Sequence, residues 1–181
     1  MDKLVQVAHL LITFASSIYI TIVMVRFLLQ LVRADFYNPL SQFIVKASNP
    51  LLLPLRKVIP GLFGIDVASL VLALLLQMAT IELLASVAGQ GFIPLLPVLI
   101  YSVFELIKLL LNIYMFAFIV IIIVSWIAPN GHNPAVELLS TITEPVLRPI
   151  RKILPPMGGL DLSIMVALLS IYILKIAFGL G

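Results

Sequence analysis

The chain of 181 residues is 62% hydrophobic and 10% charged, and its formal net charge is +3. Soluble domains are about half apolar and about a quarter charged, so this composition excludes an ordinary soluble domain and predicts a membrane protein. The absence of cysteine excludes disulfides, thiolate metal sites and thiol catalysis.

Taken in chain order, the first predicted element is an apolar run over residues 7–32. It is long enough for a membrane-spanning helix, which needs about 20 residues. Arg26 lies within this run, and we expect its side chain to reach the nearby membrane surface. A cleaved signal peptide is the less favoured alternative, because the run is too long.

The next segment, residues 38–62, is predicted to form amphipathic helices that lie in the membrane interface. Apolar residues such as Phe43 and Ile44 recur at helical spacing, with polar residues on the opposite face. Asn38 is expected to cap the first helix. Because Pro54 has no amide hydrogen, we expect it to separate this helix from a second short one.

Two further spans follow over residues 67–88 and 101–128, joined by an uncharged connection at 89–97 with two glycines and two prolines. A second amphipathic segment covers 133–157, and a last span is predicted over 162–180. The expected fold is an all-α membrane protein with four transmembrane helices.

The two halves of the chain repeat each other at a shift of 95 residues without a gap. Nine special residues match: Asn38 and Asn133, Pro39 and Pro134, Pro50 and Pro145, Pro54 and Pro149, Arg56 and Arg151, Lys57 and Lys152, Pro60 and Pro155, Gly64 and Gly159, Asp66 and Asp161. We therefore predict two tandem repeats, residues 1–94 and 95–181, with two spans each. An even number of spans gives both repeats the same orientation.

Basic residues are concentrated in the two long loops, whereas the 89–97 connection has none. By the positive-inside rule, both long loops are predicted to be cytoplasmic and both termini outside. Lys3 is the main residue that opposes this orientation.

Each amphipathic segment carries one Arg–Lys pair, Arg56 with Lys57 and Arg151 with Lys152. Two interpretations stay open. The pairs either set the topology alone, or form two platforms that bind anionic lipid head groups or an acidic partner surface, at about 1 kcal/mol per basic side chain.

Asp66 and Asp161, like Asn38 and Asn133, are interpreted as caps of the helices that follow them. Their nearest predicted partners are the basic pairs of their own segment, ten residues back in the case of the arginines. Such pairing would fix each amphipathic segment against the following span.

Glu82 and Lys175 lie inside predicted spans, where topology does not explain their charge. Helix rise places them nearly level with Ser17 and Asn112, so these four residues predict a polar layer within the membrane. Glu82 and Lys175 either pair with each other or reach the outer interface separately, and both interpretations are open.

No residue pattern supports an enzyme. His9 is expected near the outer face and His132 in a cytoplasmic loop, so the histidines cannot share a site. A nucleophile elbow, a phosphate loop and an HExxH motif are all absent. No metal site or cofactor is predicted, and the basic residues are too few for a nucleic-acid groove. Glu105 and Lys108, one turn apart, are interpreted as a solvated interfacial pair.

The pattern P-x-x-x-P-x-R-K-x-x-P-x-x-x-G-x-D, present twice in this chain, resembles the YggT family of small bacterial inner-membrane proteins. The likeness covers nearly the whole chain, notably RADFYNP, PLRKVIP and EPVLRPIRKILPPMGGLD. The resemblance implies a location in the inner membrane and links to osmotic or cation stress and to cell-division genes. For chloroplast relatives it implies cofactor assembly of a b-type cytochrome, and it names no reaction.

Together these features predict a non-enzymatic scaffold or assembly factor connected to osmotic or cation stress. Its expected partners are anionic lipids and an unknown membrane protein, and a homo-oligomer is left open. The alternative is an ion or osmolyte transporter, which needs a continuous polar path or broken helices at the midplane. The predicted spans have no internal proline and few polar residues, which favours the scaffold.

Overall fold

The computed structural model describes residues 3–61, 64–127, 133–154 and 161–180. This part of the chain contains no β-strand and folds into six helices: α1 (Lys3–Leu31), α2 (Pro39–Val58), α3 (Val67–Val87), α4 (Leu95–Ile127), α5 (Pro134–Ile153) and α6 (Leu162–Ala177). The all-α prediction is confirmed. α5 begins and ends 95 residues after α2, and α6 begins 95 residues after α3.

Three helices, α1, α3 and α4, are long and apolar enough to cross a membrane. α6 is apolar but has 16 residues, which is about 24 Å of helix against roughly 30 Å of hydrocarbon. It ends at Ala177 rather than at 180, because Gly179 adopts a φ of 63° and the amide of Leu180 returns to the carbonyl of Lys175. Four spans therefore stay a prediction.

Other boundaries differ less. α4 begins at Leu95 rather than near 101, because Pro97 lies in its first turn, where no amide hydrogen is needed. Three predicted boundaries lie outside the described residues: the ends of the segments at Leu62, at Ala128 and within 155–157.

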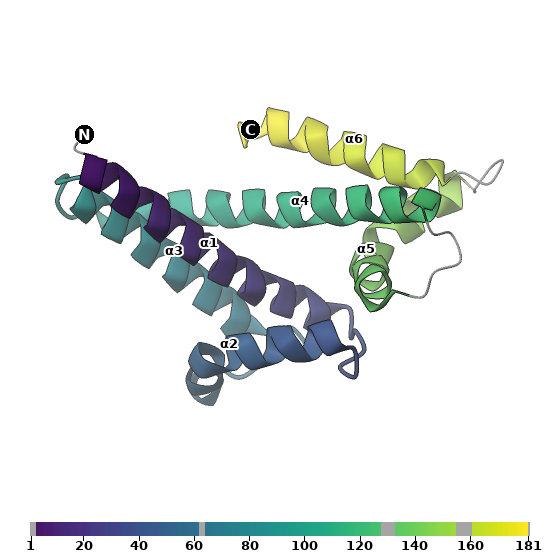
Figure 1. The fold of residues 1–181 in the computed structure, drawn as a ribbon, viewed down its shortest axis with the longest axis horizontal. Coiled ribbons are helices and arrows are strands. Elements are labelled where there is room, and N and C mark those ends of the chain that lie inside the picture. The colour runs from purple at the N-terminus through teal and green to yellow at the C-terminus, as the bar shows by residue number, and fades with distance from the viewer. Residues whose placement is uncertain (1–2, 62–63, 128–132, 155–160, 181) are drawn as a thin grey trace.

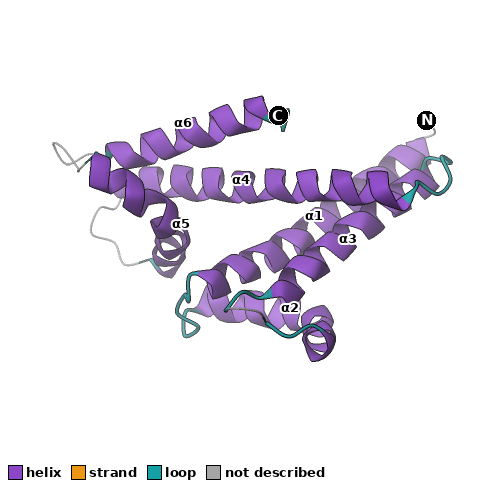
Figure 2. Ribbon diagram, turned by 180° about the vertical axis from the view of Figure 1, so that it is seen from behind, coloured by secondary structure: helices purple, strands orange, loops and turns teal. Residues whose placement is uncertain are grey.

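The prolines of the amphipathic segments do not end their helices. α2 and α5 are single helices of 20 residues that contain Pro50 and Pro54, and Pro145 and Pro149, respectively. The prediction that Pro54 separates two short helices is wrong. Each proline removes one intrahelical hydrogen bond, and the helix bends instead of ending. Figure 1 and Figure 2 show the last part of α2 turning away from the direction of its start.

The helices pack around two buried clusters. α1 and α3 lie side by side and α4 crosses them, after which α4 packs against α5 and α6 (Figure 1). The larger cluster consists of residues from α1 to α3 together with Ile113, Leu138 and Ile142 from α4 and α5. The smaller cluster contains Phe118, Leu147, Ile164, Ala167 and Ile171. The core of the first half is thus completed by side chains of the second half.

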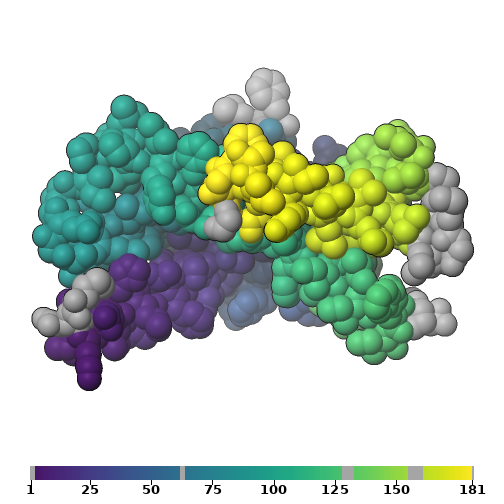
Figure 3. Space-filling model, turned by 90° about the horizontal axis from the view of Figure 1, so that it is seen from above, coloured from purple at the N-terminus to yellow at the C-terminus, as the bar shows by residue number. Residues whose placement is uncertain are grey.

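Seen from above, α6 lies over the middle of the molecule (Figure 3). It leaves uncovered the start of α1, in purple, and the region where α3 joins α4, in teal. The first turns of α1 and α4 are therefore accessible from this side.

Candidate functional site

An arginine–aspartate ion pair links α2 to α3, and a second one links α5 to α6. Arg56 of α2 donates through Nε and Nη2 to the carboxylate of Asp66. Arg151 of α5 lies 2.8 Å from Asp161 and also 2.7 Å from Glu144. This is the pairing that the sequence predicts for the arginines, and it fixes the direction in which α2 and α5 leave the following helices.

The first pair is more buried than the second. The side chains of Arg56 and Asp66 are 29% and 3% exposed, whereas those of Arg151 and Asp161 are 34% and 23% exposed. Burial away from water strengthens the attraction between opposite charges. It also raises the free-energy cost of a charge whose partner has been removed. We therefore expect the first pair to matter more for stability.

Both aspartates are held in the ionised form. Burial by itself would raise the pKa of Asp66, but hydrogen bonds from Arg56 and from the hydroxyl of Ser69 outweigh burial and lower that pKa below its ordinary value. In Asp161 burial likewise acts to raise the pKa, and hydrogen bonds from Arg151 and from the first turn of α6 lower it further than burial raises it.

Three of the residues interpreted as caps accept a hydrogen bond from the backbone amide two residues further on. The acceptors are Asn38, Asn133 and Asp161, at 2.9, 2.9 and 3.0 Å. Asp66 stands at the cap position of α3 but its side chain bonds to no backbone amide there, because Arg56 and Ser69 engage its carboxylate. Its part in the fold is the ion pair.

The two lysines of the predicted platforms differ from the two arginines. Lys57 and Lys152 are exposed, and neither forms an ion pair within the described ranges. Arg56 and Arg151 are engaged inside the protein. Of these four residues, the two lysines are the more exposed ones, and binding to a lipid head group or a partner stays a prediction.

Arg26, which is expected to reach the membrane surface, has a buried side chain, and its position relative to that surface stays a prediction. It is 6% exposed and lies 5.7 Å from the ring centroid of Phe36. Its Nε and Nη1 have no hydrogen-bond partner in the described part of the chain. Gln30, one turn further along α1, accepts a hydrogen bond from Arg56 at 2.7 Å. Arg26 is thus held inside the helix packing, with the Phe36 ring over its guanidinium.

The predicted polar layer is only partly assembled. Lys175 donates to Oδ1 of Asn112 at 2.8 Å, which joins α6 to α4. No ion pair between Glu82 and Lys175 occurs among the residues described, and Oε2 of Glu82 is buried there without a hydrogen-bond partner. The hydroxyl of Ser17 bonds to a carbonyl of its own helix. Since Lys175 finds a neutral partner on α4, the ion-pair interpretation is wrong.

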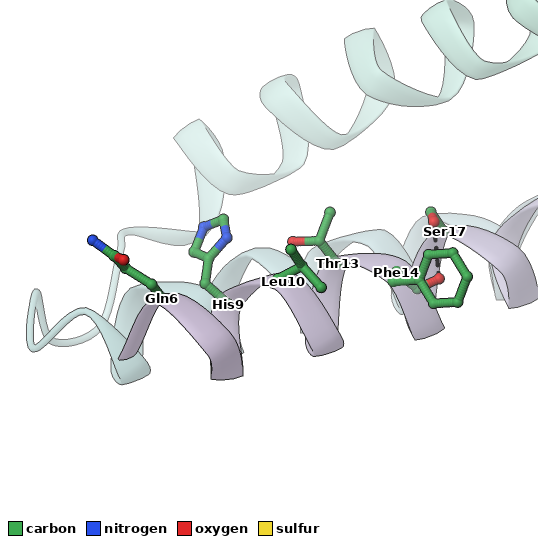
Figure 4. Close-up of a pocket in the computed structure, with 6 residues that line it drawn as sticks. All are labelled: Gln6, His9, Leu10, Thr13, Phe14 and Ser17. Atoms are coloured by element: carbon green, nitrogen blue, oxygen red, sulfur yellow. Dashed lines mark hydrogen bonds between the residues drawn. The ribbon is translucent and has the colours of Figure 1, made fainter. Parts of the chain in front are cut away.

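A polar cavity of about 380 Å³ lies between α1, α3 and α4. Its polar lining consists of His9, Thr13, Ser16, Ser17, Gln77, Thr80, Tyr101, Glu105, Lys108 and Asn112. Figure 4 shows His9, Thr13 and Ser17 on one side of α1, where they also border a neighbouring recess. Of these lining residues, Ser17 and Asn112 belong to the polar layer that the sequence predicts. The polar residues that line the cavity recur at helical spacing within otherwise apolar helices, and this pattern could have predicted a polar helix face from the sequence.

An apolar groove of about 540 Å³ lies between α1, α2, α4 and α5. Its lining consists of Thr21, Val25, Leu40, Phe43, Ile44, Leu109, Asn112, Ile113, Phe116, Ala135, Leu138, Leu139 and Ile142. The starts of α2 and α5 meet beside it, where Nδ2 of Asn38 donates to the carbonyl of Pro134 at 2.8 Å. Asn112 borders both the polar cavity and the apolar groove and therefore marks the boundary between them.

No group of three His, Asp or Glu side chains in the described part of the chain lies close enough to hold a metal ion. His9 lines the polar cavity, and His132 lies outside the described residues.

Comparison with known proteins places the chain among its relatives. An uncharacterized protein of Pseudomonas aeruginosa is 51% identical over 159 residues, which cover 86% of this chain and 80% of the relative. An uncharacterized protein of Vibrio alginolyticus is 36% identical over 170 residues, with coverage of 93% and 91%. The uncharacterized protein YggT of Escherichia coli is 35% identical over 165 residues, with coverage of 91% and 85%. No solved structure matches the chain. The sequence pattern of the CCB3/YggT family matches twice, over residues 5–87 and 100–180, and the chain therefore belongs to that family.

Proposed function

We propose that this protein is a non-enzymatic scaffold or assembly factor of the bacterial inner membrane, which holds a helix of a partner membrane protein in the apolar groove. The observation that carries the proposal is that α2 and α5, one from each half of the chain, line a single groove together with α1 and α4. Two amphipathic helices that served only as membrane anchors would not need to share a groove.

The groove offers anchoring contacts that the chain itself leaves uncovered. Phe43 is 62% exposed, Phe116 is 64% exposed and Leu40 is 41% exposed. Helix recognition commonly uses a groove of this kind, into which apolar side chains at i, i+3, i+4 and i+7 insert. The groove walls are held in place by the Arg–Asp ion pairs and by the bond from Asn38 to Pro134. Because its walls are fixed in this way, the groove should bind a helix of matching shape more tightly than it binds flexible lipid acyl chains.

Lys57 and Lys152 supply a second contact in this proposal. Exposed lysines beside interfacial helices attract anionic head groups, at about 1 kcal/mol per side chain. They would hold both amphipathic helices at the cytoplasmic surface while the groove remains open to its partner. The connection to osmotic or cation stress is part of the proposal and rests on the family resemblance alone.

A transporter is the second candidate, and the polar cavity is the observation that favours it. The polar lining reaches Asn112, however, and the groove on the other side of Asn112 is apolar. An ion or osmolyte would have to leave polar surroundings at that point. The arrangement of the described residues thus supports the scaffold over a conducting path.

Site-specific photocrosslinking in native membranes tests the scaffold. A photoreactive phenylalanine analogue at Phe43 or Phe116 should give a discrete protein adduct, whereas the same analogue at Leu169, exposed on α6, should not. Leu139→Trp, which fills the groove, should abolish the adduct. Equal adducts from all positions, or adducts with lipid only, would contradict the proposal. Saturable potassium or proline flux into liposomes that contain only this protein would instead support the transporter.

A further inference from the structure

We infer that the polar cavity between α1, α3 and α4 is a binding site for a small zwitterion, a molecule that carries one ammonium and one acidic group. This inference does not depend on the scaffold proposal. The cavity volume of about 380 Å³ falls within the roughly 300–1,000 Å³ of small-molecule sites. Its lining combines hydroxyl, amide, imidazole and charged groups from three apolar helices.

Two charges of opposite sign line this cavity and also a neighbouring recess between the start of α4 and the end of α6. Glu105 and Lys108 lie one turn apart on α4, are half-buried and both line the cavity. Neither forms an ion pair with the other or with a third residue in the described part of the chain. Charged residues inside transmembrane helices normally face a partner or a water-filled cavity, because the hydrocarbon does not solvate them. The cavity joins these two charges to the polar side chains of α1 and α3, which the neighbouring recess does not contain.

The pair of charges selects the class of ligand. A simple cation would be attracted by Glu105 but repelled by Lys108, and a simple anion would meet the reverse arrangement. A zwitterion can satisfy both residues at once and brings no net charge into the membrane, which avoids most of the desolvation cost of an ion. Hydroxyl and amide groups such as Thr13 and Gln77 can hydrogen-bond the remaining polar atoms.

The polar lining of the cavity covers only part of the length of α4. From Tyr101 at one end to Asn112 at the other, the polar face of α4 extends about 16 Å at 1.5 Å per residue, roughly half of the hydrocarbon thickness. The hydrogen bond from Lys175 to Asn112 lies at the inner end. Beyond it the apolar groove begins. The cavity is therefore suited to binding a small molecule rather than to conducting it across the membrane.

The sequence repeat shows which half of the chain supplies the charged residues of this cavity. At the shift of 95 residues, Thr13 corresponds to Lys108 and Ser17 to Asn112, so both halves carry a polar helix face. Thr13 is neutral where Lys108 is charged, and the position that corresponds to Glu105 in the first half is the apolar Leu10. The cavity is formed where the neutral face of α1 meets the charged face of α4.

The test measures binding to the full-length protein in nanodiscs of phosphatidylglycerol, which has no zwitterionic head group. The probes are glycine and γ-aminobutyrate, compared with ethylamine and acetate, each of which carries a single charge. We expect saturable binding of at least one zwitterion by isothermal titration calorimetry, at least tenfold tighter than binding of either single-charge probe. Nanodiscs that also contain phosphatidylethanolamine distinguish the source of the ligand, because a bound lipid head group would compete with the solute.

Matched variants locate the site. Glu105→Gln and Lys108→Met should each weaken binding at least tenfold, whereas Glu137→Gln and Lys46→Gln, which change exposed charges outside the cavity, should not. A variant with both Glu105→Lys and Lys108→Glu keeps one charge of each sign and should retain binding, which guards against a general folding defect. Competition by phosphatidylethanolamine would also support the inference. Absence of saturable binding by solute or lipid, or equal binding of the single-charge probes, would overturn it.

Discussion

At the scale of single residues, two arginines of the first half are in opposite situations. Arg56 is bonded to Asp66 and Gln30, so its removal leaves a carboxylate that is 3% exposed without its partner. Arg26 is buried, and two of its nitrogens have no hydrogen-bond partner in the described part of the chain. Replacing it by methionine, which has a similar volume, would therefore remove a buried charge without breaking an ion pair.

We expect Arg56→Met to lower the free energy of unfolding by about 1.5–3 kcal/mol, the value of hydrogen bonds to charged groups. Arg26→Met should change it by less than about 1 kcal/mol in either direction, since apolar replacements of buried charges are often neutral or stabilising. Denaturant unfolding in detergent measures both. A larger loss for Arg26→Met than for Arg56→Met would contradict this ranking.

The aspartates also predict how stability depends on pH. Because the pKa values of Asp66 and Asp161 are lower in the folded protein than the ordinary value of about 3.9, the unfolded chain binds protons first as the pH falls. The stabilisation is fully present above about pH 5 and is lost progressively below about pH 4. Thermal unfolding between pH 7 and pH 3 should show this loss. Joint replacement of Asp66 and Asp161 by asparagine should flatten the profile, whereas Asp35→Asn at an exposed position should not.

At the scale of helices, sequence periodicity predicted which segments are helical but not how the prolines would act. The starts of α2 and α5 follow from an asparagine cap followed by a proline, a signal that is local to the chain. Whether an internal proline ends or bends a helix depends on packing further along the chain. In α2 the buried Leu52 lies between Pro50 and Pro54, and Arg56 is held by Asp66 beyond them. Those tertiary contacts favour continuing the helix.

Pro54→Ala tests this view of α2. A proline in a helix interior ordinarily costs about 3 kcal/mol, so its replacement should stabilise an isolated helix by that amount. Here a straighter helix would carry Arg56 away from Asp66, and we expect less than about half of that gain in the whole protein. Pro149→Ala is the matched variant next to the more exposed pair and should give a larger gain. Thermal unfolding of both variants measures the difference, and equal gains would contradict a positioning role for the bend.

At the scale of the whole molecule, family membership and the apolar helices could be predicted from the sequence, because both follow from residue pattern and composition. The polar cavity could not, because it depends on which faces of α1, α3 and α4 meet. From the sequence alone, Glu105 and Lys108 are interpreted as an interfacial pair. The crossing of the helices places them in one cavity with His9 and Gln77. Likewise, counting residues along the helices predicts that Glu82 and Lys175 lie at a similar depth in the membrane. It does not predict in which direction each side chain points around its helix axis.

The orientation in the membrane can be tested with single cysteine reporters, because the chain contains no cysteine of its own. Gln90, in the uncharged connection, is exposed, as are Lys57 and Lys152 at the ends of α2 and α5. Gln90 is a better reporter than Gly91, whose φ of 73° would strain a cysteine. By the positive-inside rule, a membrane-impermeant maleimide should label Gln90→Cys in intact spheroplasts, but Lys57→Cys and Lys152→Cys only after permeabilisation. Labelling of the two lysine positions from opposite sides would show that the halves do not share one orientation, and the reverse pattern at all three positions would invert the topology.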